Sequence, residues 1–237
     1  VQLDELHEKL SVLLGLVDPV NIFSGVSAMV VLQDPDELRI VSAELFNQNL
    51  PLDSPGMLFI DSEKSSSFAP EDKHGIASLT TQEIPVILTV NGESLAAAIE
   101  HARLFTSAVL YRHHSSVNLP SWLEVGFIEY VVDSTFTDAG INARRRPGGL
   151  GVIRSNPSLN WLLGMNANNQ RMGPDGDARD VSFILVNRLI DIDPDRFRSL
   201  ILKLKKGASL QDAWKSTYGT TPQKFLADAQ EWFRFND

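Results

Sequence analysis

The sequence contains no cysteine. Disulfide bonds, thiolate metal ligands and a cysteine nucleophile are therefore excluded. The absence does not decide the compartment, because a chain without cysteine is stable in any redox setting. Long apolar runs are missing too, and no stretch approaches the roughly 18 residues that a transmembrane helix needs. We therefore expect no membrane span.

Positive charge is scarce as well. The 237 residues carry 21 Lys and Arg against 30 Asp and Glu, a formal net charge of −9. Proteins that bind nucleic acid usually present a basic stripe, and the one dense basic cluster here is Arg144, Arg145 and Arg146. We interpret this cluster as a solvated loop. We expect no nucleic-acid partner, and anionic membranes are disfavoured for the same reason.

The chain does have enough apolar residues for a core, since they make up 43% of it. The first 90 residues mix an amphipathic helix at 3–17 with a second helix that starts at Asp34 and Pro35, a capping acid followed by a first-turn proline. Apolar and β-branched runs predict strands in the same region, at 27–32, 57–60, 76–79 and 85–90. This part reads as an α/β subdomain.

From residue 91 onward the patterns are helical, apart from a stretch at 133–157 that reads as loop-rich. A sheet followed by a run of helices is typical of an α+β fold. We therefore predict a small N-terminal mixed sheet with helix over residues 1–90 and a mostly helical half over residues 91–237. The two subdomains are expected to form one compact unit.

The most informative pattern lies around residue 126. Its members, at fixed spacing, are Leu119-Pro120, Trp122-Leu123, Gly126 and Glu129-Tyr130. In residue type and spacing the pattern resembles the second helix of gluzincin-type, peptidase-MA-like zinc metallopeptidases, which reads W-L-x-E-G-x-A-E-Y after a Leu-Pro loop. The resemblance covers about residues 84–237 and is weaker over the first 80 residues. It implies a zincin-like helical half.

In that family, H-E-x-x-H on one helix supplies two zinc ligands and a general base, and a Glu on the next helix supplies the third ligand. The resemblance equates the first helix with residues 95–112, where His101 is the only internal histidine. Ala102 then stands at the general base, Phe105 at the second histidine and Val125 at the third ligand. These four vestigial positions keep one polar residue, so the resemblance implies a pseudoenzyme that has lost its metal.

Four residues of the second helix are candidates for a cleft: Trp122, Glu124, Glu129 and Tyr130. Core packing explains the two aromatic residues as well as a substrate platform does. The two acids are most simply surface residues, although Glu129 has the alternative of a structural hydrogen bond. Glu124 does not replace Val125 as a ligand, because one residue along a helix turns the side chain by about 100°.

The histidines have simple interpretations too. His101 is most simply a helical histidine with one hydrogen-bond partner, and it is only a weak metal candidate. His113 and His114 are expected at an exposed helix end, where the negative helix terminus favours them.

The leading hypothesis is a catalytically inactive, metallopeptidase-like domain without a cofactor, which binds a peptide or protein segment through its vestigial cleft. One alternative is a metallopeptidase or other hydrolase with a non-standard site, and only this alternative calls for zinc. The other is a structural or assembly domain of a larger protein, in keeping with a chain that begins at Val1 without an initiator Met. Because related peptidases are commonly exported, the resemblance also implies an extracytoplasmic location, periplasmic or secreted.

Overall fold

The computed structural model describes residues 2–15, 28–32, 34–46, 49, 56–62, 83–90, 95–115, 117–165 and 177–236. Contacts between residues group the chain into two compact units. The smaller unit is Phe23–Ala108, and the larger unit joins Val1–Ile22 to Val109–Asp237. The predicted boundary between the two subdomains was at residue 90, whereas the contacts group the N-terminal helix with the C-terminal helices.

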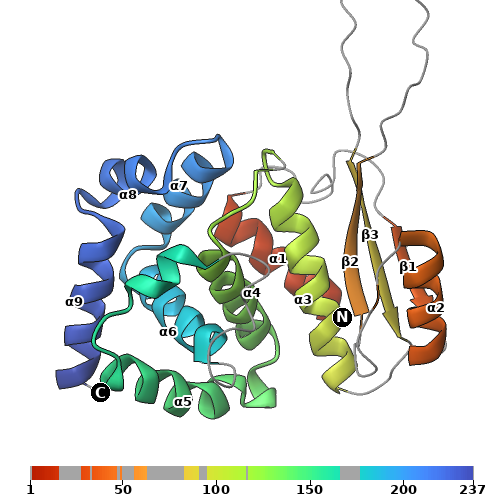
Figure 1. Cartoon of the computed structure of the whole chain (residues 1–237), viewed down its shortest axis with the longest axis horizontal. Helices are drawn as coiled ribbons and strands as arrows, with labels where there is room; N and C mark the ends of the chain where they lie inside the picture. Colours follow the sequence, from red (N-terminus) through yellow and green to blue (C-terminus); the bar gives the residue numbers. More distant parts are fainter. Residues whose placement is uncertain are drawn as a thin grey trace, which may run out of the picture. The chain divides into compact units, whose positions relative to one another are not determined.

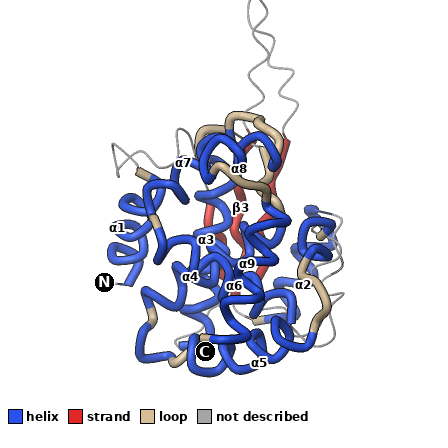
Figure 2. Tube along the Cα trace, turned by 90° about the vertical axis from the view of Figure 1, so that its left-hand side faces the viewer, coloured by secondary structure: helices blue, strands red, loops and turns tan. Residues whose placement is uncertain are grey.

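The smaller unit contains a three-stranded sheet and two helices, α2 (Pro35–Phe46) and most of α3 (Leu95–Arg112). The strands are β1 (Ala28–Leu32), β2 (Gly56–Ser62) and β3 (Glu83–Val90). Their order is β1-β3-β2, with β3 parallel to β1 and antiparallel to β2. Figure 2 shows these strands in red. The strand predicted at 76–79 lies outside the described residues.

Helix α2 starts where the sequence predicts. Pro35 occupies its first turn, and the backbone N–H of Glu37 donates to Oδ1 of Asp34 at 2.8 Å. The Asp34 carboxylate thus satisfies a donor that the first helical turn leaves without an intrahelical partner.

In the larger unit, every regular element that the structure describes is a helix. The α-helices are α1 (Gln2–Leu14), α4 (Ser121–Thr135), α5 (Ile141–Ser155), α6 (Asp177–Ile192), α7 (Pro194–Lys205), α8 (Leu210–Tyr218) and α9 (Pro222–Phe235). Two 3-10 turns join them, η2 (Thr137–Ala139) and η3 (Asn160–Gly164). In Figure 1, α4 and α6 lie at the centre of this unit, α5 crosses at one end of them and α9 runs along one side.

The last three helices begin with side-chain caps. Asp193, Ser209 and Thr221 each accept a hydrogen bond from the backbone N–H three residues further on, at 2.9, 3.1 and 3.2 Å. Helix α8 ends at Gly219, whose φ of +70° is the left-handed conformation that glycine adopts without strain. Ser209 and Gly219 thus mark the two ends of α8.

The centre of the larger unit depends on a close approach of α4 to α6. A Cβ atom built on Gly126 would lie 2.4 Å from the carbonyl oxygen of Ser182, so only glycine fits at this crossing. Phe127, on the next position of α4, stacks on Phe197 of α7 with ring centroids 5.7 Å apart. Both rings are fully buried. Three helices therefore share one apolar core around α4.

Helix α1 is tied to this core by charged side chains that bind backbone carbonyls. Arg198 of α7 donates to the carbonyl oxygens of Val12 and Leu13, at 2.7 and 3.3 Å, which satisfies acceptors at the end of α1. Lys9 of α1 donates to the carbonyl oxygen of Ser134 on α4. The N-terminal helix is therefore part of the helical unit.

The expected α+β fold class is wrong. The described chain is predominantly helical, and the strands are confined to the smaller unit. The prediction overweighted the sheet for two reasons. It counted α1 with the strands, although α1 packs on α4 and α7. It also treated residues 133–157 as loop, although most of them are helical.

Most of residues 133–157, which were predicted to be loop-rich, form α5, with Pro147 inside the helix. Arg144, Arg145 and Arg146 are therefore helical residues, and the prediction of a solvated loop for them is wrong. A Cβ built on Gly149 would lie 2.5 Å from Cδ1 of Ile184 on α6. This glycine was taken as a sign of a loop, but it brings two helices into contact.

Among the helices that the structure describes, none is both long enough and apolar enough to cross a membrane.

Candidate functional site

The framework residues of the α4 pattern pack inside the larger unit. Trp122 is fully buried, and its ring centroid lies 6.0 Å from that of Trp214 on α8. Gly126 makes the α4–α6 crossing described above. Since Trp122 has no exposed face, it does not provide a substrate platform. Both residues serve the packing of helices.

Glu129 is a buried acid, with 1% of its side chain exposed, so the expectation of a surface residue is wrong for it. Its carboxylate lies 3.4 Å from Arg145 of α5 and 3.5 Å from Arg179 of α6. Arg145 also pairs with Asp180 of α6 at 2.8 Å. We call Glu129, Arg145, Arg179 and Asp180 the Glu129 cluster. Two acids and two arginines balance each other in it.

The balance matters because a buried carboxylate without a partner is costly. The arginines also cross-link three helices, because Glu129, Arg145 and Asp180 belong to α4, α5 and α6 respectively. Arg145 is 20% exposed and Arg179 is 48% exposed. One guanidinium is thus mostly shielded from water while the other remains at the surface. The cluster is an electrostatic link between helices with one edge open to solvent.

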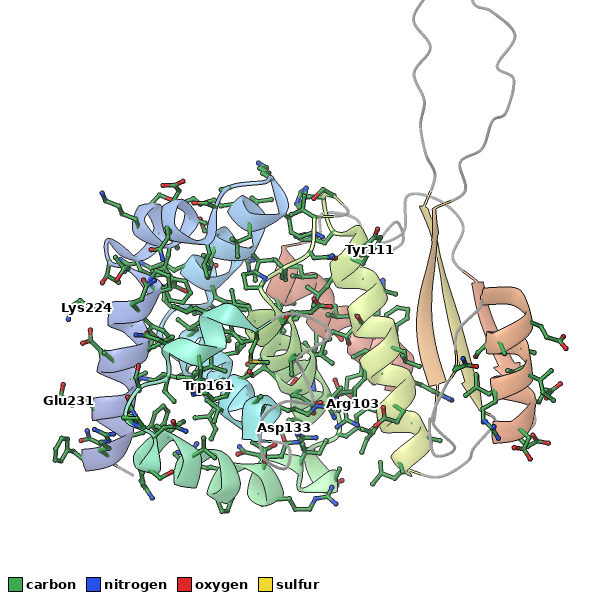
Figure 3. All side chains as sticks on the ribbon, in the orientation of Figure 1. Arg103, Tyr111, Asp133, Trp161, Lys224 and Glu231 are labelled. Carbon is green, nitrogen blue, oxygen red and sulfur yellow. The ribbon has the colours of Figure 1, made fainter. Side chains whose placement is uncertain are left out.

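A groove lies one helical turn beyond Glu129, at Asp133 on the same face of α4. Figure 3 labels Asp133. Helix α5 contributes Asn142 and Arg146, and Arg146 follows Arg145 of the cluster directly. The groove has a volume of about 500 Å³ and is open to solvent. Its lining, which we call the polar groove, consists of Asp133, Ser134, Thr137, Gly140, Asn142, Ala143 and Arg146.

Two contacts define the chemistry of the polar groove. The backbone N–H of Asn142 donates to Oδ1 of Asp133 at 2.8 Å, so the acid caps the start of α5. The side-chain Oδ1 of Asn142 is buried and has no hydrogen-bond partner among the described residues. The groove therefore offers an acid, a guanidinium, two hydroxyls and a buried acceptor oxygen. Such a set suits a ligand that carries both donors and acceptors.

The remaining cleft candidates of α4 are half-buried. Glu124 and Val125 occupy the first turns of the helix, away from the groove at its other end. Burial raises the pKa of Tyr130, and the nearby carboxylates of Asp191 and Asp133 raise it further. Of the four predicted cleft residues, Glu129 and Tyr130 lie within about one helical turn of Asp133 in the polar groove, whereas Trp122 and Glu124 belong to the first turn of α4. Asp133, Asn142 and Arg146 were missed.

The vestigial positions fall in different units. His101, Ala102 and Phe105 lie on α3 in the smaller unit, and Val125 lies on α4 in the larger one. Ala102 is buried, while His101 and Phe105 are half-buried. The Nε2 atom of His101 is buried and lacks a hydrogen-bond partner among the described residues, so the predicted single partner is not seen there. The equivalence of these positions to a zinc site stays a prediction.

The described residues contain no group of three His, Cys, Asp or Glu side chains that is placed to hold a metal ion.

A second buried charge was not predicted from the sequence. Lys205, at the end of α7, is 1% exposed, and its Nζ donates to the carbonyl oxygens of Tyr111 and Val117, at 3.0 and 2.6 Å. Ser115 donates to the carbonyl oxygen of Lys205 in return. We call these four residues together with His113 the Lys205 clamp. It holds the connection between α3 and α4 against α7.

Burial gives the clamp unusual protonation equilibria. It lowers the pKa of Lys205 to about 8, although Glu124 opposes the shift. His113 is only 6% exposed, so the expected exposed helix end is wrong for it, whereas His114 is exposed. Burial and the charges of His114 and Lys205 lower the pKa of His113 to about 4. Phe197, Ile201 and Lys205 follow one another at intervals of four residues, which places Lys205 on the apolar face of α7, and this spacing was the missed signal.

No known family matches the chain, and neither the curated proteins nor the solved structures contain a match.

Proposed function

We propose that the chain is a catalytically inactive, metallopeptidase-like domain that binds a peptide or protein segment in the polar groove. The family resemblance supports the first half of the proposal. The residues that the pattern shares with the gluzincin helix pack helices, since Trp122 is buried and Gly126 makes a helix crossing. The ligand position beside them is Val125, an aliphatic residue that offers no metal ligand.

The observation that carries the binding proposal is the groove lined by Asp133, Asn142 and Arg146, which brings an acid, an amide and a guanidinium together. A peptide main chain supplies N–H donors for Asn142 and Asp133 and carbonyl acceptors for Arg146. The opposite charges of Asp133 and Arg146 favour a main chain, which has both polarities, over a polyanion.

Binding is tested with a library of fluorescent peptides and the whole chain, by fluorescence anisotropy. Peptides that bind the native protein are then measured against Arg146→Ala and Asn142→Ala, which we expect to weaken binding about tenfold, the effect of losing one charged hydrogen bond. Arg144→Ala is the matched control, because Arg144 is an exposed neighbour outside the groove. Equal losses in all three variants, or no loss in the groove variants, contradict the proposed site.

The absence of catalysis is tested separately. The whole chain is incubated with one equivalent of zinc and a library of quenched fluorescent peptides, and we expect no cleavage. Cleavage that a chelator stops and that His101→Ala abolishes would overturn the pseudopeptidase proposal. So would one tightly bound zinc per chain that disappears in His101→Ala.

A further inference from the structure

Helix α1 belongs to the larger unit, although the smaller unit follows it in the sequence. Residues Phe23–Ala108 form the smaller unit, and they separate α1 from α4 and α7 along the chain. Contacts nevertheless join α1 to both of these helices, and Figure 1 shows α1 beside α4. Helix α1 is therefore bound to the rest of its unit as a separate segment.

One face of α1 is apolar and covered by its neighbours. Leu6, Leu10 and Leu14 follow one another at intervals of four residues, and each is at most 3% exposed. Glu8 and Val12, on the other faces of the helix, are exposed. An amphipathic helix occupies the groove of a receptor protein through a stripe of this kind. The faces of α4 and α7 that contact α1, which we call the α4–α7 face, thus act as a receptor for a helix.

Charged side chains complement main-chain oxygens on both sides of this contact. Arg198 of α7 donates to the carbonyl oxygens of Val12 and Leu13, which lie at the negative end of α1. Lys9 of α1 donates to the carbonyl oxygen of Ser134 in the last turn of α4. Each of the two cations also pairs with an acid on its own helix. The α4–α7 face therefore matches α1 in its charges as well as in its apolar stripe.

We propose that α1 exchanges between two copies of this chain, so that the α1 of each copy docks on the α4–α7 face of the other. The occupant is a second copy because the face complements α1 itself, in the leucine stripe and in the carbonyl oxygens at its end. Exchange of an identical segment keeps the contacts that α1 makes within one copy. Such an exchange is a low-cost route from a monomer to a dimer.

The first probe is a fluorescein-labelled peptide with the sequence of residues 2–15, titrated with the whole chain and followed by anisotropy. The α1 of the chain competes for the same face, so binding to the native chain is expected to be weak. Leu10→Asp in the peptide places a charge in the buried stripe and is expected to weaken binding at least about tenfold. Val12→Ala in the peptide is the matched control and leaves the affinity unchanged, because Val12 is exposed.

The same substitution in the chain is expected to act in the opposite direction. Leu10→Asp loosens the α1 of the chain and leaves the α4–α7 face to the peptide. The native peptide is therefore expected to bind this variant at least about tenfold more tightly than the native chain. Adding Arg198→Gln removes the guanidinium that binds the end of α1 and is expected to weaken binding about tenfold. Circular dichroism checks the fold of each variant, and the milder Leu10→Ala replaces Leu10→Asp in the chain if that variant unfolds.

Analytical ultracentrifugation over a range of concentrations tests for the second copy. The native chain is expected to dimerise as its concentration rises, and the Leu10→Asp chain to stay monomeric at the same concentrations. Because the chain has no cysteine, Lys9→Cys in one copy and Ser134→Cys in another provide the only thiols. A short bismaleimide is expected to link these two copies in the dimer. Lys9→Cys with Glu231→Cys, an exposed position on α9, is the control pair and stays unlinked.

Three results overturn the proposal. The first is a native chain that stays monomeric at every concentration, and the second is a Leu10→Asp chain that is folded but binds the native peptide no better than the native chain does. The third is equally tight binding of an unrelated amphipathic helix with the same leucine spacing, which assigns the face to a helix of another protein. Arg146 is not part of the α4–α7 face, so loss of library-peptide binding in Arg146→Ala concerns the proposed function alone.

Discussion

Two charges are buried to the same degree in the larger unit, yet they are compensated in opposite ways. Glu129 and Lys205 each expose about 1% of their own surface to solvent. Glu129 faces two guanidinium groups, whereas the Nζ of Lys205 donates to two neutral carbonyl oxygens. Burial lowers the pKa of Lys205 to about 8, and its hydrogen bonds to neutral carbonyl oxygens offset that desolvation only in part. One site is a cross-link, and the other is sensitive to pH.

The largest effect is expected from Glu129→Gln. The substitution keeps the shape of the side chain but leaves two arginines facing a neutral amide, so the free energy of unfolding is expected to fall by about 3 kcal/mol. Urea unfolding followed by tryptophan fluorescence measures it, because Trp122, Trp161, Trp214 and Trp232 all belong to the larger unit. Asp138→Asn is the control at an exposed acid. A loss no greater than that of the control would show that Glu129 is solvated.

The two arginines of the cluster are expected to differ. Arg145→Met breaks contacts with both Glu129 and Asp180 at a position that is 20% exposed, and we expect a loss of about 2 kcal/mol. Arg179→Met removes the contact with Glu129 at a position that is 48% exposed, and we expect a loss of less than about 1 kcal/mol. The same unfolding measurement compares them. Equal losses would contradict the assignment of Arg145 as the central link.

Part of this arrangement follows from the sequence. The capping residues and the helix that carries the pattern around Gly126 both depend on local spacing, which a single chain shows directly. The Glu129 cluster joins residues 16 and more positions apart, on three helices. No local sequence pattern predicts such a contact. The three arginines were predicted to lie in a loop because Pro147 and the glycines beside them are typical of a break in a helix.

The prediction of the fold class was wrong for a related reason. It followed the order of the strand and helix patterns along the chain and grouped the first helix with the strands nearest to it in sequence. Its true partners are distant in sequence, since Arg198 binds the carbonyl oxygens of Val12 and Leu13. The candidate site shows the same limit: Glu129 was named from its motif, while Asn142 and Arg146 become its neighbours only when α5 folds beside α4.

The Lys205 clamp is expected to respond to alkaline pH. The pKa of Lys205 is about 8 in the folded chain and 10.5 without burial, so the unfolded state binds more protons between these values. Stability therefore rises with pH there, by about 1 kcal/mol between pH 7 and 9. Lys205→Met is expected to abolish this rise, and Lys206→Met, an exposed neighbour, to keep it. A flat native profile over this range would contradict the lowered pKa.

An effect of about the same size is expected on the acid side of the same clamp. The pKa of His113 is about 4 in the folded chain and 6.5 without burial, so stability is lost as pH falls from 6.5 towards 4, by about 1 kcal/mol between pH 6.5 and 5.5. His113→Gln is expected to remove this loss. His114→Asn is expected to reduce the loss only in part, because the charge of His114 is one cause of the lowered pKa of His113, and asparagine tolerates the positive φ of 59° at that position.

The acid response also tests whether the two groups of the clamp act on each other. The charge of Lys205 is one cause of the lowered pKa of His113, so Lys205→Met is expected to raise the pKa of His113 and to reduce the acid-dependent loss. Nuclear magnetic resonance titration of the His113 ring measures this pKa in both proteins. An unchanged pKa in Lys205→Met would mean that burial alone sets it, and the clamp would then be two independent buried groups. A raised pKa of His113 in this variant would show that the charge of Lys205, whose hydrogen-bond partners are neutral carbonyl oxygens, acts on His113. The Glu129 cluster is expected to be unaffected by this substitution.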